Sequence, residues 1–159
     1  MTEPARRVVD LLTRRRLSIA VAESLTGGML CAALAAVPGV SAVLRGGIVA
    51  YATDLKAALL GVPADMLAAL GAVHPDVAGA MADGVRERLG AEVGVATTGV
   101  AGPDPAEGKP PGTVHIAVSA RGRRVTRTLA LAGGRERIRR DTVDRCLSLL
   151  WEVLTEEAA

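Results

Sequence analysis

The sequence LSIAVAESLTGGMLCAAL, residues 17–34, contains the change of chain direction on which the fold depends. Residues 17–22 are short, apolar and partly β-branched, which is typical of a strand buried on both faces. Residues 29–34 favour a helix. The polar, glycine-containing segment 23–28 lies between them and predicts a sharp connection from strand to helix. Such a strand–helix unit is typical of α/β proteins.

The rest of the chain continues this alternation in both directions. Four further strands are predicted at residues 46–51, 92–98, 113–118 and 125–131, with a hairpin turn at Arg121-Gly122 between the last two. Helices are predicted to open near Pro4 and to span residues 54–60, 63–70, 75–89 and about 134–153. We therefore expect one three-layer α/β/α domain over residues 1–159, with a mixed sheet and a C-terminal helix. The order of the strands cannot be predicted from these patterns.

The composition argues against a nucleic-acid-binding protein. Half of the 159 residues are apolar, enough for a sizeable core, and the formal net charge is only +2. Phe is absent, and Trp151 and Tyr51 are the only aromatic residues, so bases would have almost nothing to stack on. One alternative stays open, since four arginines fall in the hairpin region: Arg121, Arg123, Arg124 and Arg127. Binding through them would depend steeply on salt.

The cysteines and the long uncharged segment indicate where in the cell the protein is expected to reside. Cys31 and Cys146 are far apart and belong to no CxxC pair, which fits reduced core residues of a cytoplasmic protein. Residues 24–44 carry no charge, but Gly27-Gly28 and Pro38-Gly39 interrupt them. We expect no membrane-spanning helix.

The segment 23–28 (ESLTGG) is the first candidate for chemistry. A hydroxyl such as that of Ser24 would lie at a strand end, beside free N–H groups and the positive end of a helix dipole. That environment suits a phosphate or the oxyanion of acyl transfer. The same residues also fit an ordinary helix cap, with the glycines easing the turn.

Lys56 is the candidate base. A serine hydroxyl is a weak nucleophile unless a base takes its proton, and neither His74 nor His115 has the neighbours of a Ser-His-carboxylate triad. A lysine can serve if burial lowers its pKa. The apolar run after Lys56 could desolvate it, although an exposed surface lysine is the other interpretation.

Residues 99–112 form the longest Gly/Pro loop, placed where ligands gather in α/β sheets. The loop contains Gly108-Lys109, but the glycine spacing is wrong for a P-loop and Pro110 takes the Ser/Thr position. Arg135 and Arg139 share a helix face and could bind a phosphate, or could simply be solvated. No His, Cys or Asp spacing matches a metal site.

Taken together and in order, these segments resemble the CinA C-terminal domain family, also known as the PncC-type nicotinamide-nucleotide amidases. The resemblance covers nearly the whole chain and is carried by AESLTGG at 22–28, VPGVS at 37–41, GGIVAY at 46–51 with Lys56 and LLGV at 59–62, GAV at 71–73, TGVAGP at 98–103, KPPGTV at 109–114, and residues 134–139.

The resemblance implies that the chain hydrolyses nicotinamide mononucleotide to nicotinic acid mononucleotide and ammonia without metal or cofactor. It assigns Ser24 as nucleophile and Lys56 as base, with Ser41 as the rival nucleophile or proton relay and Tyr51 as an orienting group. The other substrate-binding residues that it implies are Thr26, Gly27 and Gly28, whose glycine N–H groups would bind the oxyanion, then Thr98, Gly99 and Gly102, and Arg135 and Arg139 near the phosphate.

The resemblance also implies an oligomeric state and a domain organisation, and four positions of the chain differ from the family pattern. We expect self-association into a homo-oligomer and absence of the amino-terminal molybdopterin-binding-like domain of longer CinA proteins. Four positions depart from the family pattern: Leu25, Val40, Ala52 and Thr53. Leu25 replaces the usual Cys, so a thiol is not the nucleophile here. The loss of polar groups at Ala52 and Thr53 leaves open a non-catalytic nucleotide-binding or competence-linked partner protein.

Overall fold

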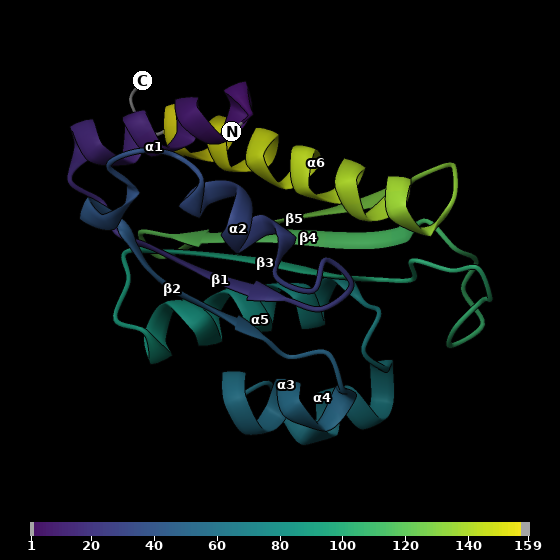
Figure 1. Cartoon of the computed structure of the whole chain (residues 1–159). Helices are drawn as coiled ribbons and strands as arrows, with labels where there is room; N and C mark the ends of the chain where they lie inside the picture. The colour runs from purple at the N-terminus through teal and green to yellow at the C-terminus, as the bar shows by residue number, and fades with distance from the viewer. Residues whose placement is uncertain (1, 157–159) are drawn as a thin grey trace.

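The computed structural model describes residues 2–156, which fold around one five-stranded sheet (Figure 1). The strands are β1 (Ile19–Glu23), β2 (Leu44–Val49), β3 (Val93–Gly99), β4 (Thr113–Ala120) and β5 (Arg123–Ala130). Their order across the sheet is β2-β1-β3-β4-β5. The pairs β2–β1 and β1–β3 are parallel, whereas β3–β4 and β4–β5 are antiparallel, so the sheet is mixed as expected.

Helices cover both faces of the sheet and complete three layers (Figure 1). They are α1 (Glu3–Arg15), α2 (Met29–Ala35), α3 (Thr53–Leu60), α4 (Ala64–Leu70), α5 (Pro75–Arg88) and α6 (Arg135–Glu156). One buried cluster joins α1, α2 and α6 to the sheet, and a second joins α3, α4 and α5 to the other face. The predicted α/β/α class with a C-terminal helix is therefore confirmed.

The local sequence explains where elements begin and end. Helix α1 starts with Pro4 in its first turn and buries one apolar stripe that includes Val8 and Leu12. Strands β4 and β5 are joined by Arg121 (φ 49°) and Gly122 (φ 77°), both left-handed, as a two-residue hairpin requires. This turn was predicted at the same two residues.

Two local differences from the sequence predictions concern the second strand. It ends at Val49 rather than at Tyr51, because the carbonyls of Ala50 and Tyr51 turn to accept hydrogen bonds from the Lys56 side chain. A short 3₁₀ turn, η1 (Val40–Ala42), precedes it and was not predicted. Pro38-Gly39 gave a signal only for the end of α2.

The topology places three connections side by side at the carboxyl ends of the parallel strands. Because β2, β1 and β3 are parallel, the segments that follow them all begin at their carboxyl ends. Glu23 pairs with Val49 on one side and with Thr97 on the other, so residues after these positions start side by side. In residues 2–156 no helix combines the length and apolarity needed to cross a bilayer.

Candidate active site

The elbow, defined as residues 24–28, lies directly after β1. Ser24 is 8 % exposed and its N–H donates to the Thr97 carbonyl on β3 at 3.1 Å. The chain then reverses through Gly27 (φ +58°) and Gly28 (φ +102°), conformations that favour glycine. The buried carboxylate of Glu23 fixes the start of α2 by accepting hydrogen bonds from the N–H groups of Leu30 and Cys31 at 2.8 and 3.0 Å.

Lys56 reaches the elbow from α3. Only 1 % of it is exposed, and its Nζ lies 3.1 Å from Ser24 Oγ, 2.8 Å from the Ala50 carbonyl oxygen and 3.2 Å from that of Tyr51. A neutral amine has two N–H donors and one lone pair. The two carbonyls can occupy the donors, which leaves the lone pair for the Ser24 hydroxyl.

Burial adjusts the protonation of this amine. Desolvation lowers the pKa of Lys56 from 10.5 to about 8, and the negative charge of Glu107 acts in the opposite direction. At pH 7.5 this shift raises the neutral fraction from roughly 0.1 % to roughly a quarter. The predicted Ser24–Lys56 contact is thus present, and its chemistry is that of a hydroxyl beside a weak base.

A cavity of about 220 Å³ opens beside these two side chains, named here the Ser24 cavity. Its walls come from the elbow, from Tyr51 and Lys56, from the chain before α5, from the end of β3 and the loop after it, and from Arg135 of α6. The other lining residues are Ser24, Leu25, Ala72, Val73, Thr98, Gly99, Val100, Ala101, Gly102, Asp104 and Ala106. The predicted Thr98, Gly99 and Gly102 therefore line one cavity with Ser24 and Lys56.

Glu107 holds one wall of this cavity and was missed by the sequence analysis. Its carboxylate accepts hydrogen bonds from the N–H groups of Ala72 and Val73 at 2.8 and 3.0 Å, which ties the loop after β3 to the chain before α5. Gly71 allows this approach, because a Cβ there would lie 2.6 Å from the carboxylate. These bonds and nearby Lys109 keep the pKa of Glu107 below its usual value despite desolvation. No local pattern marks such a contact across 35 residues.

The two arginines of α6 that were predicted to bind a phosphate, Arg135 and Arg139, have different environments. Arg135 donates from Nη1 to the Gly102 carbonyl at 2.7 Å and from Nη2 to the Tyr51 hydroxyl at 2.9 Å, so it bridges two sides of the cavity mouth. Arg139 instead donates to the carbonyls of Leu25 and Thr26 at 2.9 and 3.2 Å. Arg139 does not line the cavity, so the prediction that it lies near a phosphate is not supported by its position.

The elbow differs from the predicted oxyanion site. The N–H of Gly27 donates to the Ser24 carbonyl at 3.0 Å, so it is not available to a ligand, contrary to the prediction. Among residues 2–156, the N–H groups of Leu25, Thr26 and Gly28 have no acceptor. The Thr26 side chain is fully buried with its Oγ1 2.8 Å from Thr97 Oγ1, and neither Thr26 nor Gly28 lines the cavity.

Ser41 lies at the amino ends of the parallel strands, opposite the carboxyl ends where Ser24 lies. It belongs to η1, which precedes β2, and the adjacent Val43 carbonyl accepts the N–H of Ile19 at the start of β1. Ser24 follows the opposite end of β1, about 16 Å away along a five-residue strand. Within one chain, Ser41 is therefore too far from Lys56 to act as the rival nucleophile or the proton relay.

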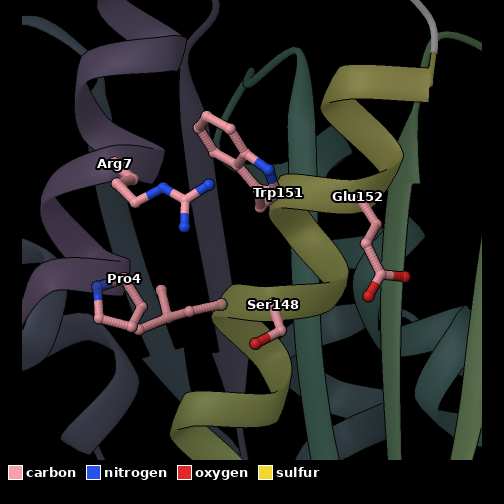
Figure 2. A pocket seen from close by; sticks show the side chains of 6 residues that line it. Pro4, Arg7, Ser148, Trp151 and Glu152 are labelled. Carbon is pink, nitrogen blue, oxygen red and sulfur yellow. The ribbon is translucent and has the colours of Figure 1, made fainter.

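Other groups with chemical potential lie outside the Ser24 cavity. Within residues 2–156, no three His, Cys, Asp or Glu side chains gather so that they could hold a metal ion. A second cavity of about 140 Å³ lies between α1 and α6, where Pro4, Arg7, Ser148, Trp151 and Glu152 line it (Figure 2). There the guanidinium carbon of Arg7 is 4.2 Å from the centroid of the Trp151 ring, a cation–π contact.

Comparisons with known proteins agree with the fold. The family model described as CinA C-terminal domain matches residues 1–154. A CinA-like protein of Frankia casuarinae is 54 % identical over 147 residues, which are 92 % of this chain and 34 % of that protein. The chain thus spans about a third of the length of the curated relatives it matches.

Solved structures give the same result. A CinA superfamily protein from Klebsiella pneumoniae superposes with a TM-score of 0.94 at 34 % identity, over 97 % of each chain. The competence/damage inducible protein CihA from Agrobacterium tumefaciens superposes with a TM-score of 0.91 at 39 % identity, over 96 % of this chain and 94 % of that one.

Proposed function

The chain belongs to the CinA C-terminal domain family, and on that premise we propose that it hydrolyses the carboxamide of nicotinamide mononucleotide. The products are nicotinic acid mononucleotide and ammonia, and one water is consumed. The observation that carries the proposal is the buried amine of Lys56, 3.1 Å from the Ser24 hydroxyl, with its two other neighbours both carbonyl oxygens.

The first half of the reaction acylates Ser24. Neutral Lys56 takes the hydroxyl proton while Ser24 Oγ forms a bond to the carboxamide carbon, and the carbonyl oxygen becomes an oxyanion. The unoccupied N–H of Leu25, a residue that lines the Ser24 cavity, is its nearest backbone donor in sequence. The C–N bond then breaks, Lys56 returns its proton to the nitrogen, and ammonia leaves a Ser24 ester.

The second half uses the same two side chains. Lys56, neutral again, removes a proton from water, whose oxygen attacks the ester carbon. The ester bond breaks, and the proton passes back to Ser24 Oγ. Because the base must be uncharged in both halves, the lowered pKa of Lys56 supports activity at neutral to weakly alkaline pH.

The arginine at the mouth of the cavity supports binding of an anionic substrate group. Apart from Lys56, Arg135 is the only Arg or Lys among the described residues that line the Ser24 cavity. Its hydrogen bonds to the Gly102 carbonyl and the Tyr51 hydroxyl are to neutral acceptors. A phosphate is a stronger partner for a guanidinium, so Arg135 would exchange these bonds for a charged pair.

Ammonia release from nicotinamide mononucleotide, with chromatography of the acid product, tests the proposal. The wild-type chain in the presence of a chelator should release one ammonia for each acid formed. Ser24→Ala should lose at least about 10³-fold in kcat, because the covalent route is removed. Ser148→Ala, an exposed serine of α6 whose hydroxyl bonds only the Asp144 carbonyl, is the matched control and should keep full activity.

A second role is distinguished in the same experiment. Calorimetry that shows binding of the mononucleotide by a wild-type chain that releases no ammonia would establish a binding protein and reject the hydrolase. Full activity in Ser24→Ala would reject the nucleophile.

A further inference from the structure

Arg139 of α6 contacts the elbow through two backbone carbonyls. We propose, resting on the proposed function, that Arg139 is a positioning residue for the reaction at Ser24: its guanidinium holds the two peptide groups that follow Leu25 and Thr26, and so fixes the backbone turn that carries the nucleophile. It acts through the backbone and does not touch the substrate.

The contacts are specific to these two peptide groups. Nε lies 2.9 Å from the Leu25 carbonyl oxygen, and Nη2 lies 3.2 Å from that of Thr26. The guanidinium also lies close against the elbow, since a Cβ at Gly27 would be 3.3 Å from Nη2. Arg139 is half-buried, directly after the buried Ile138 of α6, so the helix core determines where the side chain starts.

Peptide geometry converts these contacts into an orientation. The carbonyl and the N–H of one peptide group point in opposite directions. The Leu25 carbonyl shares its peptide group with the unoccupied N–H of Thr26, so Arg139 directs that N–H away from itself.

The next peptide group, between Thr26 and Gly27, is hydrogen-bonded to the backbone of Ser24. The Thr26 carbonyl shares its peptide with the Gly27 N–H, which donates to the carbonyl of Ser24 at 3.0 Å. One guanidinium thus restrains the turn directly after the nucleophile and, through the Gly27 N–H, the backbone of Ser24 itself.

The opposite side of the elbow is restrained independently. The Glu23 carboxylate holds the N–H groups of Leu30 and Cys31, so the start of α2 stays in place without Arg139. The loss of Arg139 should therefore loosen the peptides 25–27 while β1 and α2 keep their positions. We expect a defect in reaction rate that is larger than the defect in stability.

A phosphate-free probe separates this role from phosphate binding. An alkyl fluorophosphonate reacts when Ser24 Oγ bonds to phosphorus, the P–F bond breaks to release fluoride, and the serine proton passes to Lys56. The reaction needs the same placement of Ser24 Oγ between Lys56 and the reacting atom. Intact-mass spectrometry follows the reaction at Ser24 and does not require that the chain accept any nucleotide.

The variants are Arg139→Lys, which keeps the charge but loses the paired donors, and Arg139→Gln, which keeps a neutral donor. We expect Arg139→Lys to slow labelling of Ser24 by about 10- to 100-fold. Its pH profile should keep the wild-type midpoint, because Lys56 is untouched. Arg140→Lys is the matched control: Arg140 is the next residue, pairs with Glu136 at 2.6 Å, and should label at the wild-type rate.

Each result decides the proposal. Labelling of Arg139→Lys at the wild-type rate, with or without a higher KM for the mononucleotide, would overturn it. A melting temperature lowered to the assay temperature in both variants, with the folded fraction still labelling normally, would also overturn it. Slow labelling in a folded variant supports it even if the wild type releases no ammonia, in which case only the proposed substrate is wrong. A wild-type Ser24 that never labels would end both proposals.

Discussion

The amine of Lys56, the base of the proposed reaction, is also costly to bury when the chain folds. Its side chain is among the largest that the fold buries completely. Desolvation disfavours the ammonium form there, which is why the pKa of Lys56 falls to about 8. The unfolded chain has no such restriction, so protonation is linked to stability.

The pH dependence of stability should show this linkage. Between pH about 8 and 10.5 the unfolded chain binds more protons at Lys56 than the folded chain does, so this residue makes stability rise with pH. Lys56→Met should abolish that contribution. Urea-unfolding midpoints measured across this pH range, wild type minus variant, give the test. Lys109→Met, the only other lysine, keeps Lys56 and should keep the slope. An equal slope in Lys56→Met would contradict the assignment.

The predicted site residues that the structure brings together are those with a local signal. Ser24 lies on a strand–helix connection and Lys56 just beyond a second strand, and parallel strands bring such positions together. Ser41 and Arg139 lie away from the Ser24 cavity, and their places depend on the strand arrangement for Ser41 and on the course of α6 for Arg139. A motif shows that a side chain is present, but the direction in which it points depends on packing.

The loop after β3 affects the Ser24 cavity through the carboxylate of Glu107. Glu107→Gln removes the negative charge that raises the pKa of Lys56, so the midpoint of the acid limb of kcat/KM should move to lower pH. The same change weakens the bonds to the N–H groups of Ala72 and Val73, and KM should rise.

Initial rates over a pH series measure both effects. Glu92→Gln is the matched control, because Glu92 also binds a backbone N–H, that of Ser18 at 2.7 Å, but at the far edge of the sheet. A midpoint that stays in place or moves upward in Glu107→Gln would show that this charge does not act on the base.

Helix α3 owes its position to a glycine of α5. A Cβ on Gly84 would lie 1.8 Å from the carbonyl oxygen of Leu60, the last residue of α3. Gly84→Ala should therefore destabilise the chain by about 2 kcal/mol or more, despite the gain of about 1 kcal/mol in helix propensity. Urea unfolding measures it.

Gly79→Ala on the same helix supplies the comparison for that substitution. A Cβ at Gly79 meets only the flexible end of Arg124, at 2.8 Å, so this variant should lose much less stability. Equal stability of the two variants would show that α3 can move away from α5 at little cost.

The sequence predicted which strands and α-helices exist, but it did not predict how they are arranged in the fold. Periodicity identified all five strands and the hairpin turn, because each signal lies within a few residues. The β2-β1-β3 order depends on contacts between segments up to 74 residues apart, such as Ile19 with Val93. The end of β2 was displaced because the carbonyls of Ala50 and Tyr51 accept hydrogen bonds from Lys56, although the Ala50 N–H still donates to Glu23 of β1.

Across the whole molecule, the arginines of β5 are largely neutralised by the chain itself. Arg123 pairs with Glu156 at 3.3 Å, Arg124 with Asp83 at 2.8 Å, and Arg127 with Glu152 at 2.5 Å. We expect no binding of duplex DNA at low ionic strength, measured by fluorescence anisotropy. Freeing two arginines with Glu152→Gln and Glu156→Gln together should create weak, salt-sensitive binding. Strong binding by the wild type would restore the nucleic-acid hypothesis.

The contact between Arg7 and Trp151 has an optical consequence. Trp151 is the sole indole of the chain, so light absorbed near 295 nm is re-emitted from one place, the seam between α1 and α6. Arg135 lies on the same helix about 24 Å away, from a rise of 1.5 Å per residue. A change in Trp151 fluorescence when a ligand binds beside Ser24 would therefore report a movement of α6 that reaches the contact with α1. The measurement needs no added dye.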